Sequence, residues 1–218
     1  MTAKSEVLRR VREVGLVPVV RAQSAEEATA AVQAILAGDV PVVEVTLTVP
    51  GAVSVIEALS DRFGEQVLVG AGTVLDAPSA RACILAGARF VVSPALDIPT
   101  IECCRRHGVA VFPGALTPTE VLTAWTAGAD MVKIFPAGNV GGAAYIKSLK
   151  APLPHIDLVP TGGVNLDTVG AFIEAGSAAV GVGGELVDLK ALRAGQPEVL
   201  TAKARQFVER IRRARGLA

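Results

Sequence analysis

Residues 117–134 read TPTEVLTAWTAGADMVKI, and this stretch contains one complete structural repeat. Thr117 and Glu120 have the spacing of a capping box, with a proline at the first helical position, so a helix is expected to begin here. Gly128 fits the left-handed position that ends many helices. The apolar run at 130–134 is typical of a short buried strand. The stretch therefore predicts a helix, a glycine stop and a strand in succession.

The same unit recurs along the chain. Ser24 and Glu27 repeat the capping-box spacing at the start of another predicted helix. Seven glycines precede short apolar runs and fit the left-handed position after a helix, namely Gly15, Gly38, Gly64, Gly87, Gly108, Gly128 and Gly176. One further run follows a helix that prolines end. The eight predicted strands are residues 16–21, 40–45, 67–70, 89–92, 109–112, 130–134, 156–160 and 178–182.

Strands that alternate with helices predict a parallel sheet. Eight such units in about 200 residues predict a compact (β/α)8 TIM barrel, here with an extra helix at 6–14 before the first strand. The alternative is a doubly wound sheet. Such a sheet would be expected to have a glycine-rich dinucleotide-binding turn after its first strand, and residues 17–23 contain no such turn. No stretch resembles a linker, so we expect a single domain over residues 1–218.

The composition argues against several classes of partner. Lys plus Arg and Asp plus Glu both number 21, so we expect neither a nucleic-acid nor a membrane surface. The amino terminus lacks a signal-peptide core, and no apolar run approaches the ~18 residues of a membrane span, which indicates a soluble, cytoplasmic protein. Cys83, Cys103 and Cys104 form no metal-binding motif, so they are interpreted as packing cysteines in a reducing compartment, and no metal or cofactor is expected.

Lys133 is unusual within its apolar run because a buried ammonium is costly. An ordinary lysine has a pKa near 10.4, so only about one in 2,500 is neutral at pH 7. Desolvation and nearby cations lower the pKa of a lysine, and a neutral amine can attack a carbonyl to form a Schiff base. The alternative is a strand-end lysine that extends to solvent. The run alone leaves both interpretations open.

Glu44 is a second ionisable group within a predicted strand. Alternate residues of a strand share a face, so Glu44 and Thr46 would point into the barrel while the apolar residues between them face the helices. Active sites of such barrels lie at the carboxyl ends of the strands, where Lys133 also belongs. Glu44 is therefore either half of a structural ion pair or a general acid–base beside a nucleophilic amine.

Two Gly-Gly pairs, at 162–163 and 183–184, follow the seventh and eighth predicted strands. Loops at these two places bind phosphate in many barrels through backbone N–H groups. Thr161 would add a hydroxyl donor. Arg21, at the end of the first predicted strand, would grip a carboxylate or phosphate with two hydrogen bonds, or would simply be a surface strand-end arginine.

Taken in order, these strand ends resemble the class I aldolases that act on 2-keto-3-deoxy-6-phosphogluconate (KDPG) and 2-keto-4-hydroxyglutarate (KHG). The resemblance extends over nearly the whole chain. The matching motifs are Val17-Pro-Val-Val-Arg21, Glu44-Val-Thr46, Gly70-Ala-Gly-Thr73, Ser93-Pro94, Pro113-Gly114, Thr117-Pro-Thr-Glu120, Lys133-Ile-Phe-Pro-Ala137, Pro160-Thr-Gly-Gly-Val164 and Gly181-Val-Gly-Gly184.

This resemblance implies a lyase that needs no metal and cleaves KDPG to pyruvate and D-glyceraldehyde 3-phosphate. It also implies a TIM barrel that assembles as a homotrimer. Lys133 would form the imine with the ketone carbon of the keto acid, and Glu44 would move protons. The implied substrate-binding residues are Arg21, Thr73, Pro94 and Phe135, with Thr161, Gly162, Gly163, Gly183 and Gly184 around the phosphate.

Two positions depart from the commonest pattern of that family. Thr48 stands where some members have an arginine, and Gly184 is followed by Glu185 where many members have a serine after the strand-8 glycine. The substrate is therefore open among KDPG, its galactonate epimer and KHG. Remoter alternatives are a metal-free sugar-phosphate isomerase, in which Lys133 is a charged electrophile, and a non-catalytic phosphate-binding barrel.

Overall fold

The structure, a computed structural model, describes residues 3–217. Its strands are β1 (Leu16–Val20), β2 (Val42–Thr46), β3 (Leu68–Gly72), β4 (Phe90–Val92), β5 (Ala110–Phe112), β6 (Gly114–Ala115), β7 (Val132–Ile134), β8 (Leu158–Pro160) and β9 (Val180–Val182). Its helices are α1 (Lys4–Val14), α2 (Ala25–Leu36), α3 (Ala52–Phe63), α4 (Ala77–Leu85), α5 (Ile98–Arg106), α6 (Pro118–Ala127), α7 (Gly142–Lys150), α8 (Val169–Glu174), α9 (Leu189–Arg193) and α10 (Pro197–Ala214), with a 3-10 turn η1 (Ala137–Val140).

All the strand pairs are parallel, and together they close into a ring. One run has the order β5-β4-β3-β2-β1-β9 and the other β6-β7-β8. β5 and β6 are two halves of one barrel strand, interrupted at Pro113, which has no N–H to donate. A parallel bridge between Thr161 and Gly181 joins the end of β8 to β9. The predicted (β/α)8 barrel is confirmed, and the doubly wound alternative is wrong.

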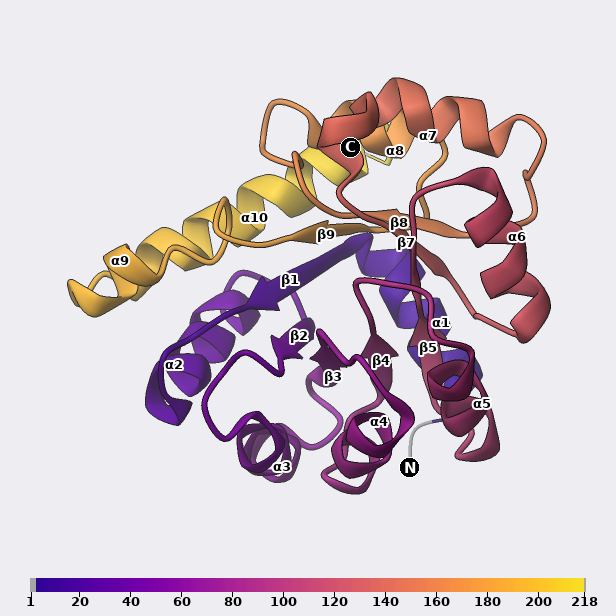
Figure 1. Ribbon diagram of the computed structural model, residues 1–218. Helices are drawn as coiled ribbons and strands as arrows, with labels where there is room; N and C mark the ends of the chain where they lie inside the picture. The colour runs from indigo at the N-terminus through magenta and orange to yellow at the C-terminus, as the bar shows by residue number, and fades with distance from the viewer. Residues whose placement is uncertain (1–2, 218) are drawn as a thin grey trace.

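The apolar side chains form two layers, one on each side of the strands. The inner cluster fills the barrel and includes the stacked rings of Phe90 and Phe112, whose centroids are 5.4 Å apart. The larger outer cluster lies between the strands and the helices that surround them (Figure 1) and includes Val43 and Val45. Because strand side chains alternate between these layers, a polar residue in an inward register must enter the barrel.

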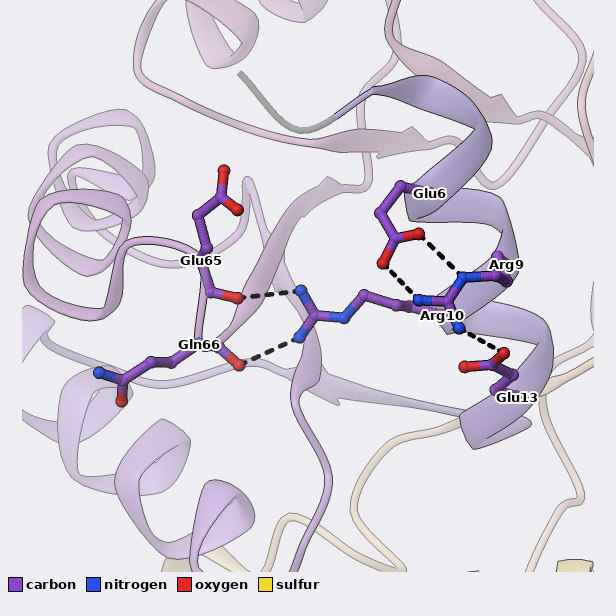
Figure 2. Close-up of polar contacts among 6 residues, drawn as sticks. All are labelled: Glu6, Arg9, Arg10, Glu13, Glu65 and Gln66. Carbon is purple, nitrogen blue, oxygen red and sulfur yellow. Dashed lines mark hydrogen bonds and ion pairs between the residues drawn. The ribbon is translucent and has the colours of Figure 1, made fainter.

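Helix α1 covers the amino-terminal end of the barrel. Its Val7 and Val11 belong to the inner apolar cluster. Figure 2 shows Arg10 reaching from this helix to the segment before β3, where it donates hydrogen bonds of 2.9 and 3.2 Å to the carbonyl oxygens of Glu65 and Gln66. The predicted extra helix is therefore a plug, and it leaves the carboxyl ends of the strands as the barrel's mouth.

Ion pairs attach the other side of α1 to the same end of the barrel. Lys4 pairs at 2.8 Å with Asp130, which precedes β7, and Arg12 pairs at 2.7 Å with Asp157, which precedes β8. Each pair is partly exposed and contributes on the order of 1 kcal/mol or less. These contacts set the orientation of the helix, while burial of its valines supplies most of its stability.

Six of the seven predicted glycines have a positive φ, although Gly64, with a ψ of −120°, lies outside the left-handed helical region, and the prediction for Gly38 is wrong. Asp39 takes the positive φ of 65° there, a conformation that Asp tolerates better than most residues. Gly38 is needed for a different reason, since a Cβ at this position would lie 2.6 Å from Ala204 Cβ on α10. The glycine permits close packing of α10 against the end of α2.

The two predicted capping boxes have different outcomes. At α6 both hydrogen bonds are present, since Thr117 accepts from the Glu120 N–H and Glu120 accepts from the Thr117 N–H. At α2 the Ser24 hydroxyl accepts from the Glu27 N–H, but the Glu27 carboxylate accepts from Gln23 instead of from Ser24. One of the two hydrogen bonds of the second capping box is therefore present, and the Glu27 carboxylate binds a different backbone N–H.

We expect Cys83 and Cys104 to resist thiol reagents in the native protein. Both are free and buried, and burial raises the pKa of Cys83 to about 11 and that of Cys104 to about 12. Because only the thiolate reacts, iodoacetamide at pH 8 should leave both unmodified by mass spectrometry until denaturant is added. Rapid modification of either thiol in native protein would contradict this.

The same raised pKa values make the free energy of unfolding depend on pH. The contribution of the two thiols is fully present below their ordinary pKa of 9.0 and is lost as the pH rises toward 11–12.

Candidate active site

Lys133 of β7 and Glu44 of β2 meet inside the barrel. These strands are not neighbours in the ring, so the side chains approach each other across the interior. Lys133 Nζ lies 4.0 Å from Glu44 Oε1, and the residues are only 4% and 2% exposed. The interpretation of Lys133 as a strand-end lysine that extends to solvent is therefore wrong. A buried lysine and a buried carboxylate with no closer contact form a long, imperfect ion pair.

The carboxylate of Glu44 keeps an unused acceptor. Its Oε1 is buried and has no hydrogen-bond partner among residues 3–217. A buried polar atom without a partner costs about 1–3 kcal/mol, and such atoms in native proteins commonly belong to functional sites. The arrangement leaves Glu44 free to bind a group that enters the barrel or to exchange a proton with it.

The end of β3 is shaped around that carboxylate. A Cβ on Gly72 would overlap the carboxylate, lying 2.5 Å from Glu44 Cδ, so only glycine leaves room for it. The next residue, Thr73, has a positive φ of 56°, which is rare for a β-branched residue. Backbone strain of this kind concentrates at active sites. Thr73 thus directly follows the glycine that lies against the Glu44 carboxylate.

Phe135 and Pro94 border Lys133 on the same part of the mouth. Lys133 Nζ lies 5.3 Å from the centroid of the Phe135 ring. Gly114 pairs in register with Lys133, and a Cβ on Gly114 would overlap the backbone of Pro94. Ser93, buried before Pro94, donates from its hydroxyl to the Ala95 carbonyl at 2.5 Å. The Phe135 ring therefore lies near the amine, and Pro94 lies against the strand that pairs with Lys133.

The two Gly-Gly turns leave their backbone donors free. None of the N–H groups of Gly162, Gly163, Gly183 and Gly184 donates to a protein acceptor in the described part of the chain. Gly162 and Gly163 have positive φ values of 87° and 77°. A Cβ on Gly163 would lie 2.8 Å from Gly138 Cα, so the turn also packs against the segment after β7. Unpaired N–H groups at converging turns are suited to an anion.

Arg21 lies directly over one of these turns. A Cβ on Gly183 would be 2.6 Å from Arg21 Nη1. The parallel register of β1 and β9, with Pro18 beside Val182, brings the two strand ends together. Arg21 is exposed, and its guanidinium has no ion-pair partner within residues 3–217. It is a cation at the mouth with open donors.

Thr161 is buried and directly follows the last residue of β8. A Cβ on Gly181 would overlap Thr161 Oγ1, so this hydroxyl points across the bridge toward β9. Gly184 has open space around its Cα. The structure thus brings the two catalytic candidates together, and it brings Arg21 to the glycine turns as a second group.

Two threonine hydroxyls form a hydrogen-bonded pair at the end of β2. Thr46 Oγ1 and Thr48 Oγ1 are 2.6 Å apart, and Thr46 also donates to the carbonyl of Val20 at 3.2 Å. Val20 immediately precedes Arg21. Thr48, noted in the sequence for the absence of an arginine, therefore takes part in a hydrogen-bond chain that leads from β2 to the Arg21 loop.

No group of three or more His, Cys, Asp or Glu side chains within residues 3–217 is arranged to hold a metal ion. None of the helices described is long and apolar enough to cross a membrane.

The family profile for KDPG and KHG aldolases matches residues 7–202. The chain belongs to this family. The resemblance noted from the strand-end motifs is thereby confirmed, and it covers the segments that carry Lys133, Glu44 and both glycine turns.

Individual relatives agree with the family assignment. A 2-dehydro-3-deoxy-phosphogluconate aldolase of Treponema pallidum is 33% identical over 204 residues, covering 94% of this chain and 95% of that protein. A 2-dehydro-3-deoxy-6-phosphogalactonate aldolase of Escherichia coli is 37% identical over 201 residues, covering 91% and 95%. The structure of a Legionella pneumophila KDPG aldolase, with pyruvate captured as a covalent carbinolamine, matches with a TM-score of 0.81 at 27% identity, covering 90% of this chain and 96% of that one.

Some site features had only weak signals in the sequence. Gly72 lies within the quoted Gly-Ala-Gly-Thr motif. Its register partner is Thr46, and its contact with the Glu44 side chain becomes visible only when β2 and β3 are paired. Gly138 follows the Lys133 strand directly, yet its packing against Gly163 depends on a contact distant in sequence. The positive φ of Thr73 has no sequence signal of its own.

Replacing Gly72 with Ala should displace the Glu44 carboxylate. The added methyl group overlaps it, and a displacement of about 1 Å at a reacting group can lower a rate about 100-fold. Gly72→Ala should therefore fold, by circular dichroism, and lose most aldolase activity in steady-state assays. Gly170→Ala is the matched control, because its Cβ would meet only Ala214 Cβ at 4.0 Å. Equal activity of the two variants would contradict the assigned geometry.

Proposed function

We propose that this protein is a class I aldolase that reversibly cleaves KDPG, 2-dehydro-3-deoxy-6-phosphogluconate, to pyruvate and D-glyceraldehyde 3-phosphate. The observation that carries the proposal is the buried pair of Lys133 and Glu44, with Nζ 4.0 Å from Oε1 at the mouth of a family-matched barrel. A structural ion pair would be expected at hydrogen-bonding distance with its remaining acceptors satisfied. Glu44 Oε1 has no such partner in the described chain.

In the proposed reaction the neutral amine of Lys133 attacks the C2 ketone and forms a carbinolamine. Loss of water gives a protonated imine, which draws electrons from the neighbouring C3–C4 bond. Glu44 accepts the proton of the C4 hydroxyl as that bond breaks, releasing the aldehyde and leaving an enamine of pyruvate. Protonation of the enamine at C3 and hydrolysis of the imine release pyruvate and regenerate Lys133. The overall reaction needs no oxidant or reductant.

Thr73, Pro94 and Phe135 are the proposed lining of the pyruvate half. Thr73 follows Gly72, which lies against Glu44. The Phe135 ring is 5.3 Å from Lys133 Nζ, and the Pro94 backbone lies against Gly114, the strand partner of Lys133. An aromatic ring beside the amine limits the access of water to it. A few precisely placed polar groups in an otherwise apolar pocket are typical of small-molecule sites.

The proposed site for the phosphate half consists of the two glycine turns and the residues around them, namely Thr161, Gly162, Gly163, Gly183, Gly184 and Arg21. Free backbone donors in the two turns would bind phosphate oxygens, and the Arg21 guanidinium over Gly183 would add charge. Because the Thr161 hydroxyl is buried against Gly181, we assign it chiefly to holding the β8 turn beside β9.

A second candidate is the galactonate epimer of KDPG. It is favoured by the 37% identity to the Escherichia coli phosphogalactonate aldolase. The two epimers need the same imine chemistry and the same phosphate site, so both are compatible with these residues. KHG, which lacks the phosphate, is the third substrate to compare, and kcat/KM for the three would rank them.

We also infer that the whole chain works as one catalytic domain in a cytoplasmic homotrimer. Leu75, two residues before α4, and Leu85, the last residue of α4, are 63% and 66% exposed and offer apolar surface for association. Sedimentation equilibrium at micromolar concentration should give three times the chain mass of 22.3 kDa. A single species at the monomer mass would refute the trimer and leave the proposed chemistry untouched.

Treatment with pyruvate and borohydride should reduce an imine on Lys133. Mass spectrometry of proteolytic peptides should find the pyruvyl adduct there and not on Lys147, a lysine on the surface helix α7. Lys133→Ala should lose both the adduct and turnover, whereas Lys147→Ala should keep both. An unmodified Lys133 in an active preparation would exclude the Schiff base and favour the isomerase alternative, in which this lysine stays charged.

Replacing Glu44 with Gln should separate imine formation from proton transfer. The amide keeps the size of the side chain but cannot accept a proton, so kcat should fall by a factor of about 10²–10⁴. A borohydride-trapped adduct on Lys133 should still form on prolonged incubation with pyruvate. Wild-type kcat in Glu44→Gln would show that Glu44 is only a structural partner of Lys133.

A further inference from the structure

Glu27 of α2 and Arg193 of α9 form an ion pair beside the mouth, away from the reacting groups. Arg193 Nε donates to Glu27 Oε1 at 2.5 Å, and Nη2 donates to Oε2 at 3.2 Å. The Glu27 side chain is only 11% exposed, while that of Arg193 is 46% exposed. Two hydrogen bonds from one guanidinium fix direction as well as distance.

The same carboxylate also holds the loop that carries Arg21. Glu27 Oε2 accepts a hydrogen bond of 2.6 Å from the backbone N–H of Gln23, two residues beyond Arg21. Ser24, the next residue, is tied to the start of α2 because its hydroxyl accepts from the Glu27 N–H at 3.2 Å. The loop after β1 is therefore fastened to α2 by both the backbone and the side chain of Glu27.

On the other side, Arg193 is fixed relative to the second glycine turn. The N–H groups of Leu186 and Val187 donate to the Gly183 carbonyl at 3.0 and 2.9 Å, and both side chains are buried. Asp188 then begins α9, accepting from the Ala191 N–H at 3.1 Å. Helix α9 carries Arg193 one turn later. A short segment of chain, held by these hydrogen bonds, thus connects Gly183 to Arg193.

The two fastened segments meet at the mouth, where Arg21 Nη1 lies over Gly183. Arg21 itself has no ion-pair partner in the described chain, so the position of its side chain over Gly183 depends on how its backbone is held. Besides the pairing of β1 with β9, the ion pair between Glu27 and Arg193 is a side-chain link between the Arg21 loop and the segment that follows Gly183.

We propose that Glu27 and Arg193 are positioning residues that hold Arg21 over the Gly183–Gly184 turn and thereby set the preference for phosphorylated substrates. This inference rests on the proposed function, in which Arg21 and the turn bind the phosphate. Neither residue touches the Lys133–Glu44 pair, so the link should act on binding of the anionic end and not on the imine chemistry.

The charge state of Glu27 supports a permanent link. The hydrogen bonds from Arg193 are the main reason that the pKa of Glu27 lies below its ordinary value, and the Gln23 N–H lowers it further. The carboxylate is therefore ionised throughout the neutral range. α9 also packs against α2, so the pair is supported by the contact between its own helices.

The test compares KDPG with KHG in two variants. Arg193→Met removes the ion pair and keeps the length of the side chain, and Glu27→Gln keeps an acceptor for Gln23 but loses the charge. For both we expect kcat/KM for KDPG to fall about five-fold, mainly through KM, with little change for KHG. Competitive inhibition by inorganic phosphate gives a second readout, and its inhibition constant should rise by about the same factor.

Two controls separate positioning from general destabilisation. Arg213→Met removes a comparable but exposed ion pair with Glu209, 3.0 Å long and on α10, and should change neither readout. Arg193→Lys keeps the charge and should recover part of the loss. Trapping of pyruvate on Lys133 with borohydride should remain at the wild-type level in every variant, which also verifies that each one is folded.

The outcomes distinguish this inference from the proposed function. Unchanged discrimination between KDPG and KHG, with an unchanged phosphate inhibition constant in both Arg193→Met and Glu27→Gln, would overturn the inference while leaving the aldolase intact. Equal loss on both substrates would also overturn it, because a general structural role does not select for phosphate. Absence of a pyruvate adduct in the wild-type protein would instead refute the proposed function.

Discussion

The site depends on one interaction, the buried pairing of Lys133 with Glu44 across the barrel. A charge this deep is tolerated only with an opposite charge nearby, and the 4.0 Å separation leaves that pairing incomplete. The incompleteness is useful, because a carboxylate with an open acceptor and an amine without a close hydrogen bond are both available to a substrate. A tighter pair would be more stable and less reactive.

The rest of the fold places and preserves this pair. Closure of the strands into a ring turns the inward registers of β2 and β7 toward each other, although the strands are far apart in the sequence. Helix α1 covers the opposite end of the barrel through Val7 and Val11. Figure 1 shows it behind the ring of strands. Glycines at 72 and 114 admit the carboxylate and the neighbouring loop, where any side chain would collide. Stability is concentrated in the two apolar layers, while the proposed site residues lie at the strand ends.

Sequence periodicity predicted the barrel because helix caps and glycine stops are local signals that repeat. It also predicted that Glu44 faces inward, since alternation along a strand is a local rule. The outcome for Gly38 shows where local rules fail, because this glycine serves packing against Ala204 of a distant helix. Glu27 is similar: its capping spacing was recognisable, but its carboxylate serves Gln23 and Arg193, and the latter is 166 positions away. Contacts between distant segments, such as these, need the folded chain to become visible.

The central claim is that Lys133 and Glu44 together interconvert pyruvate and its enamine. Exchange of the pyruvate methyl protons with solvent tests it without any assumption about the aldehyde half. In D2O, proton NMR should show catalytic loss of the methyl signal with the wild-type protein, slower loss with Glu44→Gln and none with Lys133→Ala. A stable methyl signal in the presence of folded wild-type protein would contradict the account.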